Sequence, residues 1–403
     1  MSKTVTTPYA CQFEENYDLR RAYEETARCL LCEDAPCSTG CPAGTDPAKF
    51  IRSLRLKNVV GAAETIRENN PLGGSCASVC PYGNLCEKEC SRTGIDKPIR
   101  IGMIQKFLVE QEQVQEMNFI HPLPSNGKRV ACVGAGPASL SCARELALQG
   151  YDVTVYEAHD KAGGVLTYGI LPSRLPQSVV DFDIETIKKA GVKFEFGKKL
   201  SPEEIKGLKD TYDAVFLGIG LWSPNGVDVP GKDAQNVLFA IDFLEVARDK
   251  TKELKLGENV VVIGGGDVAM DCAATAKQLG ARTSIVYRRT LEEAPANIDE
   301  LSSVQAMGIP IITEFAPEEI LTENGKATAL KAKGRDGFSE LTLKADQIIF
   351  AIGQKLDDTF AEIKEEDGFY QGGDMMHGRG KTVVEAVADG KIAAFKIMEA
   401  LRK

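Results

Sequence analysis

Eight of the twelve cysteines fall in two short runs, CLLCEDAPCSTGC at residues 29–41 and CASVCPYGNLCEKEC at residues 76–90. Thiols that cluster in a reducing compartment are metal ligands far more often than disulfide partners. Zinc usually takes two C-x-x-C pairs, but only Cys29 and Cys32 have that spacing. Iron–sulfur clusters tolerate the wider spacings, and the proline directly after Cys80 is typical of ferredoxin-type runs. The runs therefore favour iron–sulfur ligation, with zinc as the alternative.

A first glycine-rich turn, VGAGPAS, lies between a β-branched run and a helical pattern. Gly134, Gly136 and Ser139 have the spacing G-x-G-x-x-S. In a dinucleotide-binding unit, the first glycine permits a tight turn and the second lets a pyrophosphate approach the backbone. The helix that starts around Pro137 offers free N–H groups to that phosphate. Glu157 ends the next strand, where an acid accepts a hydrogen bond from a ribose hydroxyl.

A second turn, VIGGGDVA, repeats this arrangement with glycines at 264 and 266 and an alanine at 269. The candidate nucleotide contacts of this turn are Gly265, Gly266, Asp267 and Val268. The strand that follows ends in Arg288 and Arg289, and an arginine there can pair with the 2′-phosphate of NADP. The alternative is a solvated strand end, which leaves NADH open. Two such units on one chain favour FAD on the first and a nicotinamide nucleotide on the second.

Further glycines lie where a flavin would approach the backbone. Gly164 follows the acid of the first unit in a Gly-Gly pair. Near the C-terminus, GGDMMHGRGKTVVEAV places Gly373 and Asp374 before a helix that should start near Thr382. In flavoproteins with two dinucleotide units, a Gly-Asp of this kind contacts the ribityl and phosphate groups. The apolar strand expected before it is reduced to DGFYQ.

The elements that must position these residues change in character along the chain. Up to about residue 110 the apolar residues recur at helical intervals, and Asp46 before Pro47 forms a plausible N-cap. A polar connector, EQVQEMNFIHPLPSNGKR, then precedes short β-branched runs that alternate with helices. The predicted strands lie in KRVACVGAG, YDVTVYE, YDAVFLGIG, NVVVIGGG, RTSIVYRR and LKADQIIFAIG. This alternation predicts an α/β fold with parallel sheets.

The expected architecture is an all-helical N-terminal domain followed by two Rossmann-like dinucleotide-binding domains. We expect the helical domain to cover residues 1–125 and the FAD domain to be discontinuous, at 126–245 and 346–403. The nicotinamide-nucleotide domain, at 246–345, would then be inserted into it. A chain of 403 residues is long enough for this division.

Composition excludes several classes of function. The net charge of −10 disfavours binding to nucleic acid or to an anionic membrane. The chain has no charged and apolar leader at its start and no run of about 18 apolar residues, so we expect a cytoplasmic protein without a membrane span. With three histidines, two of them in linker or turn contexts, no catalytic acid, base or nucleophile is assigned.

Taken together, these motifs resemble the flavin and iron–sulfur subunit of bacterial NAD(P)H-dependent dihydropyrimidine dehydrogenase. The segments ARCLLCEDAPCSTGCPAGTDPAKFIRS, AAETIRENNPLG, IGMIQKF, GAGPASLSCA and GGGDVAMDCA all fit that family, and the glutamate synthase small subunit shares the architecture. The resemblance implies two [4Fe-4S] clusters, one held by Cys29, Cys32, Cys37 and Cys90, the other by Cys41, Cys80, Cys86 and Gln105. It leaves out Cys76, which is then a small buried residue. It also implies a flavin contact at Arg174 and a nicotinamide-nucleotide contact at Ala351 and Gly353.

The function implied by the resemblance is electron input. NAD(P)H would be oxidised at FAD, and electrons would pass through the two clusters to a partner subunit that carries FMN and further iron–sulfur centres, in a heterotetramer. That partner would reduce uracil or thymine to the 5,6-dihydropyrimidine, reversibly. An alternative acceptor is the large subunit of glutamate synthase. From a different class, a zinc-stabilised module that only binds nucleotides remains an alternative.

Overall fold

The computed structural model describes most of the chain as two compact units. The described residues are 16–248, 254, 256–360, 362–366 and 368–402, so residues 1–15 of the expected helical domain lie outside them. Among them, one unit comprises 16–167, 174–221 and 356–402, and the other 168–173 and 222–355. None of the helices in these residues is long and apolar enough to cross a lipid bilayer.

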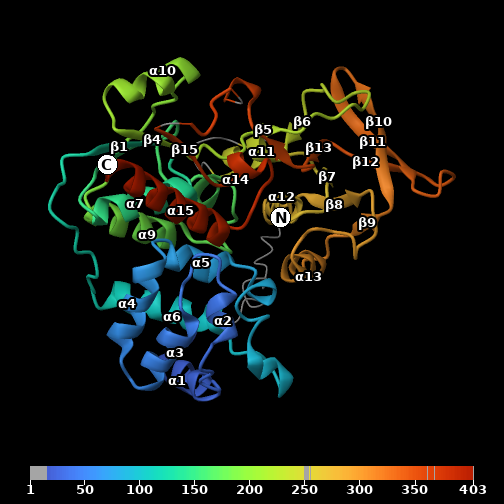
Figure 1. The fold of residues 1–403 in the computed structure, drawn as a ribbon. Helices are drawn as coiled ribbons and strands as arrows, with labels where there is room; N and C mark the ends of the chain where they lie inside the picture. The colour runs from blue at the N-terminus through green and yellow to red at the C-terminus, as the bar shows by residue number, and fades with distance from the viewer. Residues whose placement is uncertain (1–15, 249–253, 255, 361, 367, 403) are drawn as a thin grey trace. The chain divides into compact units, whose positions relative to one another are not determined.

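The first unit begins with a helical bundle. Its helices are α1 (Leu19–Ala27), α2 (Pro36–Thr39), α3 (Pro47–Arg55), α4 (Val59–Asn69), α5 (Gly73–Val79) and α6 (Ile101–Val114), with 3-10 turns at Tyr82–Asn84 and Ser91–Gly94. Figure 1 shows α1, α3, α4 and α6 gathered together, and fully buried Phe50, Leu54 and Ile66 belong to their common core. The predicted cap is confirmed, because the Asp46 carboxylate accepts a hydrogen bond of 3.0 Å from the Lys49 N–H.

A parallel five-stranded sheet forms the rest of the first unit, in the order β15-β4-β1-β2-β3. Its strands are β1 (Arg129–Val133), β2 (Asp152–Tyr156), β3 (Lys193–Glu195), β4 (Ala214–Leu217) and β15 (Phe369–Gln371). Its helices are α7 (Pro137–Leu148), α8 (Val165–Tyr168, which extends one residue into the second unit), α9 (Gln177–Lys189), α10 (Pro202–Gly207), α14 (Asp374–His377) and α15 (Val383–Leu401), with 3-10 turns at Leu208–Asp210 and Asp358–Phe360. The reduced segment DGFYQ therefore still supplies a strand, β15, which pairs with β4 at the edge of the sheet.

Helices α7 and α15 lie side by side in this unit (Figure 1). The Ser141 hydroxyl donates a hydrogen bond of 2.8 Å to the Val387 carbonyl. A Cβ at Gly390 would lie 2.1 Å from the Ala138 carbonyl oxygen, closer than real contacts allow. Glycine at 390 therefore permits the close crossing of the two helices.

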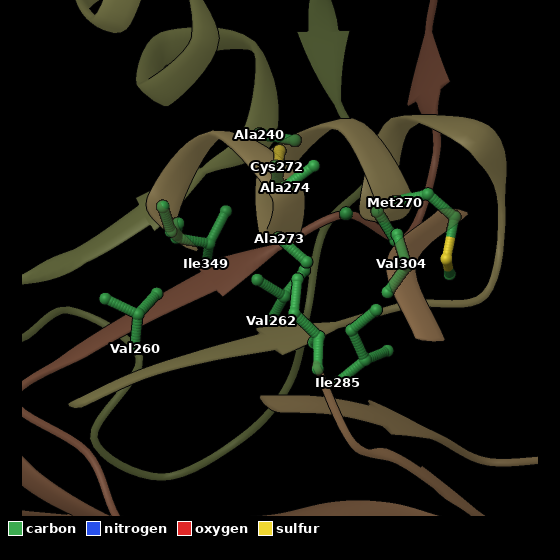
Figure 2. Packing of buried hydrophobic residues seen from close by; sticks show 14 of the residues in the cluster. Ala240, Val260, Val262, Met270, Cys272, Ala273, Ala274, Ile285, Val304 and Ile349 are labelled. Atoms are coloured by element: carbon green, nitrogen blue, oxygen red, sulfur yellow. The ribbon is translucent and has the colours of Figure 1, made fainter. Parts of the chain in front are cut away.

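The second unit contains another parallel five-stranded sheet, in the order β6-β13-β7-β8-β9. Its strands are β6 (Val237–Phe239), β7 (Asn259–Ile263), β8 (Arg282–Tyr287), β9 (Ile311–Thr313) and β13 (Gln347–Phe350), and its helices are α11 (Ala240–Arg248), α12 (Asp267–Gln278) and α13 (Ile298–Ala306). Figure 2 shows Val262 and Ile285 of the sheet packed beneath Ala273 of α12, and all three are fully buried. All six strands predicted from the sequence are present, so the α/β class is confirmed.

The second sheet extends beyond the expected limits of 246 and 345. Strand β6 precedes residue 246 and β13 follows residue 345, yet both belong to the sheet, and β13 pairs with β7. The reason is that β7 pairs with β8 on one side and with β13 on the other. Strand β13 comes late in the chain, after an intervening antiparallel sheet. That sheet, of β10 (Phe315–Glu323), β11 (Lys326–Gly334) and β12 (Glu340–Lys344), was not predicted, and neither was the short antiparallel pair of β5 (Ser223–Pro224) and β14 (Gln354–Lys355).

Candidate functional site

Four cysteines of the helical bundle line one cavity. Cys29 follows α1, Cys32 lies before α2 and Cys37 lies in it. Cys90, which is 61 residues after Cys29, immediately precedes the 3-10 turn at Ser91–Gly94. Ala48, Ile51 and Ile101 also line it, so the cavity is largely apolar. Backbone N–H groups face the sulfurs: Leu31 donates to Cys29 Sγ and Ile99 to Cys90 Sγ, each at 3.5 Å. Hydrogen bonds of this kind stabilise thiolates that ligate iron.

The electrostatics of this cavity suit a group that brings positive charge. Burial is the main reason that the pKa of Cys37 is raised to about 11, and the neighbouring Cys90, Cys29 and Cys32 add to it. Iron binds the deprotonated thiolate. Several buried thiolates repel one another, so they need the positive charge of metal ions between them. The four sulfurs line a common cavity, and in a [4Fe-4S] cluster each cysteine binds a different iron. This donor set therefore fits the cluster that the resemblance implies.

A second group of thiols lies around α5 and the turn after it. A hydrogen bond with Cys76 and burial raise the pKa of Cys80 well above its usual value, and Cys86 and Cys41 contribute further. Burial likewise raises the pKa of Cys86, with added effects from Glu87 and Cys41. Cys41, Cys80 and Cys86 therefore interact with one another, although they come from both runs of the sequence.

Two side chains are candidates for the fourth iron ligand in this second group. Gln105, on α6, is 6% exposed, and its amide nitrogen donates a hydrogen bond of 2.8 Å to the Gly73 carbonyl. In the arrangement that the resemblance implies, its amide oxygen would therefore be the atom that binds iron. Cys76 is 1% exposed and hydrogen-bonded to Cys80. The resemblance assigns the position to Gln105, whereas proximity alone would also allow Cys76.

The first glycine turn is built from segments that need glycine to approach one another. Gly134 has φ +87°, and a Cβ there would lie 2.7 Å from the Gly218 carbonyl oxygen. Gly136 caps α7, and a Cβ at Gly164 (φ +56°) would lie 3.0 Å from the Gly136 Cα. At Gly373 (φ +74°) a Cβ would lie 3.0 Å from the Ala138 Cβ. All these backbones thus lie close to the start of α7, where Pro137 is the first helical residue.

Polar side chains surround the same turn. Glu157, which follows β2, is 6% exposed, and its carboxylate accepts hydrogen bonds from the Ala135 and His159 N–H groups at 2.7 and 2.8 Å. These bonds fix the carboxylate beside the turn, and its oxygens still have lone pairs for a ribose hydroxyl. The Ser139 hydroxyl is buried and has no hydrogen-bond partner among the residues that the structure describes. It fills the space against Gly218, where an added Cβ would lie 2.3 Å from its oxygen.

The C-terminal candidates follow β15 directly. The Asp374 carboxylate accepts a hydrogen bond of 2.8 Å from the Lys381 N–H, and burial raises the pKa of this carboxyl. Thr382 is the N-cap of α15 and forms a capping box with Glu385. Arg174 lies partly buried in the turn between α8 and α9.

The second glycine turn contacts the end of β13. Gly264 has φ +151°, and a Cβ there would lie 2.2 Å from the Ala351 carbonyl oxygen. Gly266 caps α12, whose first residue, Asp267, accepts a hydrogen bond of 2.7 Å from the Asn297 N–H. Val268 is 40% exposed at the start of this helix. The helix start is thus open to a phosphate, as in the first unit.

Four further candidates belong to this second nucleotide-binding unit. A Cβ at Gly265 would lie 2.4 Å from the ring of Tyr287, so the turn packs directly on the end of β8. Gly353 (φ +96°) accepts a hydrogen bond from the Asn225 N–H. Arg288 and Arg289 follow β8 and are exposed, and neither forms an ion pair with any residue in the described part of the chain.

We expect Gly264→Ala to weaken nicotinamide-nucleotide binding at least about tenfold, because the added methyl group forces the turn away from Ala351. Titration of the purified protein with NADH and NADPH measures this, with flavin content as a check on the other unit. Gly280→Ala is the matched control, since φ is +99° there but nothing lies within 4 Å of the added Cβ. Equal binding by both variants would contradict the expectation.

One buried polar network lies outside every predicted site. Arg67 of α4 is 1% exposed and contacts Glu112 of α6 and Asp183 of α9, each at 2.7 Å. Asp183 also accepts hydrogen bonds of 2.7 and 2.8 Å from the N–H and hydroxyl of Ser75 in α5. The network joins the cysteine-bearing bundle to the first sheet domain. No sequence signal marked it, because each of its members lies in an ordinary amphipathic helix.

Comparison with known proteins relates both parts of the chain to redox families. Residues 9–117 match the family model described as dihydropyrimidine dehydrogenase domain II, 4Fe-4S cluster, and residues 128–390 match that of the pyridine nucleotide-disulphide oxidoreductases. The NAD-dependent dihydropyrimidine dehydrogenase subunit PreT of Salmonella typhimurium and that of Escherichia coli K12 are each 43% identical, over 93% of this chain and 92% of theirs. The NADPH-Fe(3+) oxidoreductase subunit beta of Geobacter sulfurreducens is 34% identical over 81% of this chain and 52% of its own length.

Solved structures show the same fold at lower identity. Mycobacterium tuberculosis FprA in complex with NADPH aligns with a TM-score of 0.58 and 17% identity, over 70% of this chain and 85% of FprA. A 2-naphthoyl-CoA reductase complex aligns with a TM-score of 0.58 and 22% identity, over 80% of this chain and 47% of that one.

Proposed function

Because the chain belongs to the family of the NAD-dependent dihydropyrimidine dehydrogenase subunit PreT, we propose that it is the electron-input subunit of such a dehydrogenase. The chain is a flavin-dependent NAD(P)H oxidoreductase with an iron–sulfur domain. The observation that carries the proposal is the combination, on one chain, of two dinucleotide-type glycine turns with two groups of cysteines.

We assign FAD to the first sheet domain. The N-terminus of α7 would bind the pyrophosphate, with Gly134, Gly136 and Gly164 keeping the backbone close enough. Glu157 would accept from a ribose hydroxyl. Gly373, Asp374, Thr382 and Arg174 would contact the remaining flavin phosphate and ribityl groups. No residue is assigned as an acid or base.

The nicotinamide nucleotide is assigned to the second sheet domain. The N-terminus of α12 would hold its pyrophosphate beside Gly265, Gly266, Asp267 and Val268, and Ala351 and Gly353 would lie near the nicotinamide half. When bound, FAD accepts two electrons as a hydride from reduced nicotinamide and releases them singly, which suits one-electron iron–sulfur carriers. The protein's part is to bind and orient each nucleotide.

Two [4Fe-4S] clusters would carry the electrons out of the chain. One would be held by Cys29, Cys32, Cys37 and Cys90, the other by Cys41, Cys80, Cys86 and Gln105. The names of the related proteins describe them as subunits, which supports a partner subunit. We propose that this partner carries FMN and iron–sulfur centres, reduces uracil or thymine, and forms a cytoplasmic heterotetramer with this chain.

Anaerobic co-purification with the candidate partner tests the proposal. The complex should contain iron, acid-labile sulfide, FAD and FMN, and should oxidise NADH or NADPH only when uracil or thymine is added. Formation of glutamate from 2-oxoglutarate and glutamine, without pyrimidine reduction, would overturn the choice of acceptor. Protein with zinc but no iron, sulfide or flavin absorbance would overturn the redox function itself.

We expect Arg288→Ala to raise the Michaelis constant for NADPH more than that for NADH. The exposed guanidinium at the end of β8 can pair with a 2′-phosphate that NADH lacks. Steady-state rates with each nucleotide and an artificial electron acceptor measure the two constants. Equal changes would show that Arg288 does not bind the 2′-phosphate.

A further inference from the structure

Lys391 of α15 reaches from the first sheet domain into the cysteine-bearing bundle. Its ammonium group donates hydrogen bonds of 2.8 Å to the Ala43 carbonyl and 2.9 Å to the Asn69 carbonyl. Ala43 is buried and lies two residues after Cys41, and Asn69 is the last residue of α4. The cation thus gives a hydrogen-bond donor to the last carbonyl of α4. It also contacts the backbone of the loop that carries Cys41.

Among the residues that the structure describes, none forms a direct ion pair with this ammonium group. Lys391 is partly buried, and its hydrogen bonds go to neutral carbonyl groups. The charged groups that act on it are Glu145, Arg144 and Cys41, and Glu145 is itself paired with Arg144 at 2.9 Å. Burial lowers the pKa of Lys391, whereas Glu145 and the hydrogen bonds donated to two carbonyl oxygens favour its ammonium form. A positive charge in a weakly screened setting therefore lies beside a cluster-ligand loop.

We propose that Lys391 raises the reduction potential of the cluster assigned to Cys41, Cys80, Cys86 and Gln105, so that this cluster is easier to reduce than it would be without the lysine charge. The inference rests on the proposed function. Adding one electron to a cluster adds one negative charge, and a nearby, partly buried cation stabilises the reduced state more than it stabilises the oxidised state. Lys391 is a positioning and tuning residue and is not a ligand of the cluster.

The helix that carries Lys391 also begins at the proposed flavin site. Lys391 lies nine residues after Thr382, the N-cap of α15, which corresponds to about 14 Å along a helix. The contact of the neighbouring Gly390 with Ala138 of α7 keeps this helix in place. One rigid element therefore connects the flavin-binding segment with the loop of Cys41, and the position of the cation is fixed by the flavin domain.

Redox titration of the intact holoprotein, followed by electron paramagnetic resonance, tests the inference. Lys391→Gln keeps an N–H donor for the two carbonyls and removes the charge, whereas Lys391→Arg keeps the charge. In the Gln variant we expect the cluster assigned to Cys41 to become harder to reduce. At a fixed potential, its ratio of reduced to oxidised form should fall about tenfold, which corresponds to a reduction potential lower by about 59 mV for a one-electron couple. The reduction potential of the cluster assigned to Cys29 should not change in the Gln variant, and neither potential should change in the Arg variant. Lys396→Gln is the matched control, because Lys396 lies on the same helix but is paired with Glu365, and this variant should also keep both potentials.

Each result decides a different question. Wild-type protein without two clusters would overturn the proposed function on which the inference rests. With two clusters present, an unchanged potential in the Gln variant would overturn the role of Lys391, as would an equal shift in the Lys396 variant. Loss of one cluster from the Gln variant, with iron and sulfide falling together, would show that Lys391 only supports the loop, and would also overturn the inference.

Discussion

Cys86→Ser is expected to remove one iron–sulfur cluster and leave the other, so that iron and acid-labile sulfide fall to about half of the wild-type content. Cys86 is 8% exposed and interacts with Cys41 and Cys80. A serine at this position would leave one iron of the buried cluster without its thiolate ligand. Serine is a poor substitute, because its hydroxyl keeps its proton where a thiol would lose it. Electron transfer from NAD(P)H beyond the flavin should stop, while reduction of the flavin by NAD(P)H continues.

Cys76→Ser is the matched control for this prediction. Cys76 is 1% exposed and hydrogen-bonded to Cys80, yet the resemblance excludes it as a ligand. Its serine variant should therefore keep the full content of iron and sulfide, measured by colorimetric assay on anaerobically prepared protein. If Cys76→Ser also lost half of the iron while Gln105→Ala did not, Cys76 would be the fourth ligand in place of Gln105.

Asp183→Ala is expected to lower the free energy of unfolding of the first unit by about 3–5 kcal/mol. The substitution leaves the guanidinium of Arg67 buried without one of its two carboxylate partners, and leaves the Ser75 N–H without its acceptor. A denaturant titration of the holoprotein, followed by circular dichroism, measures the change. Since α9 and α5 both lose a contact, flavin and iron should also be released at lower denaturant concentration than in the wild type.

A surface ion pair serves as the comparison. Glu68→Ala removes the partner of Lys49, whose side chain is 53% exposed, and should cost less than about 1 kcal/mol. Similar losses for Asp183→Ala and Glu68→Ala would mean that the buried network contributes no more than an exposed pair. The bundle and the first sheet domain would then be held together mainly by their other contacts, which include the hydrogen bonds of Lys391 to the Ala43 and Asn69 carbonyls.

Much of the fold was predictable from local patterns. The glycine spacings, the β-branched runs and the Asp46-Pro47 cap each depend on residues close in sequence, and the corresponding turns, strands and helix start are present in the structure. The limits of the second sheet were less predictable. Strands β6 and β13 join it through pairing with residues far along the chain, and no local signal in a short apolar run says which sheet it enters.

The available chemistry was predictable from the residue types and their spacing: clustered thiols for iron, and glycines where a phosphate must approach the backbone. Which of these residues come together depends on the folded chain. It brings Cys90 to the cavity of Cys29, and it places Lys391 beside the loop of Cys41 across more than 300 residues of chain. It also buries Arg67 between two carboxylates. The physical reason is that spacing reports local geometry, whereas the charge and burial that tune a redox centre come from side chains brought together only by folding.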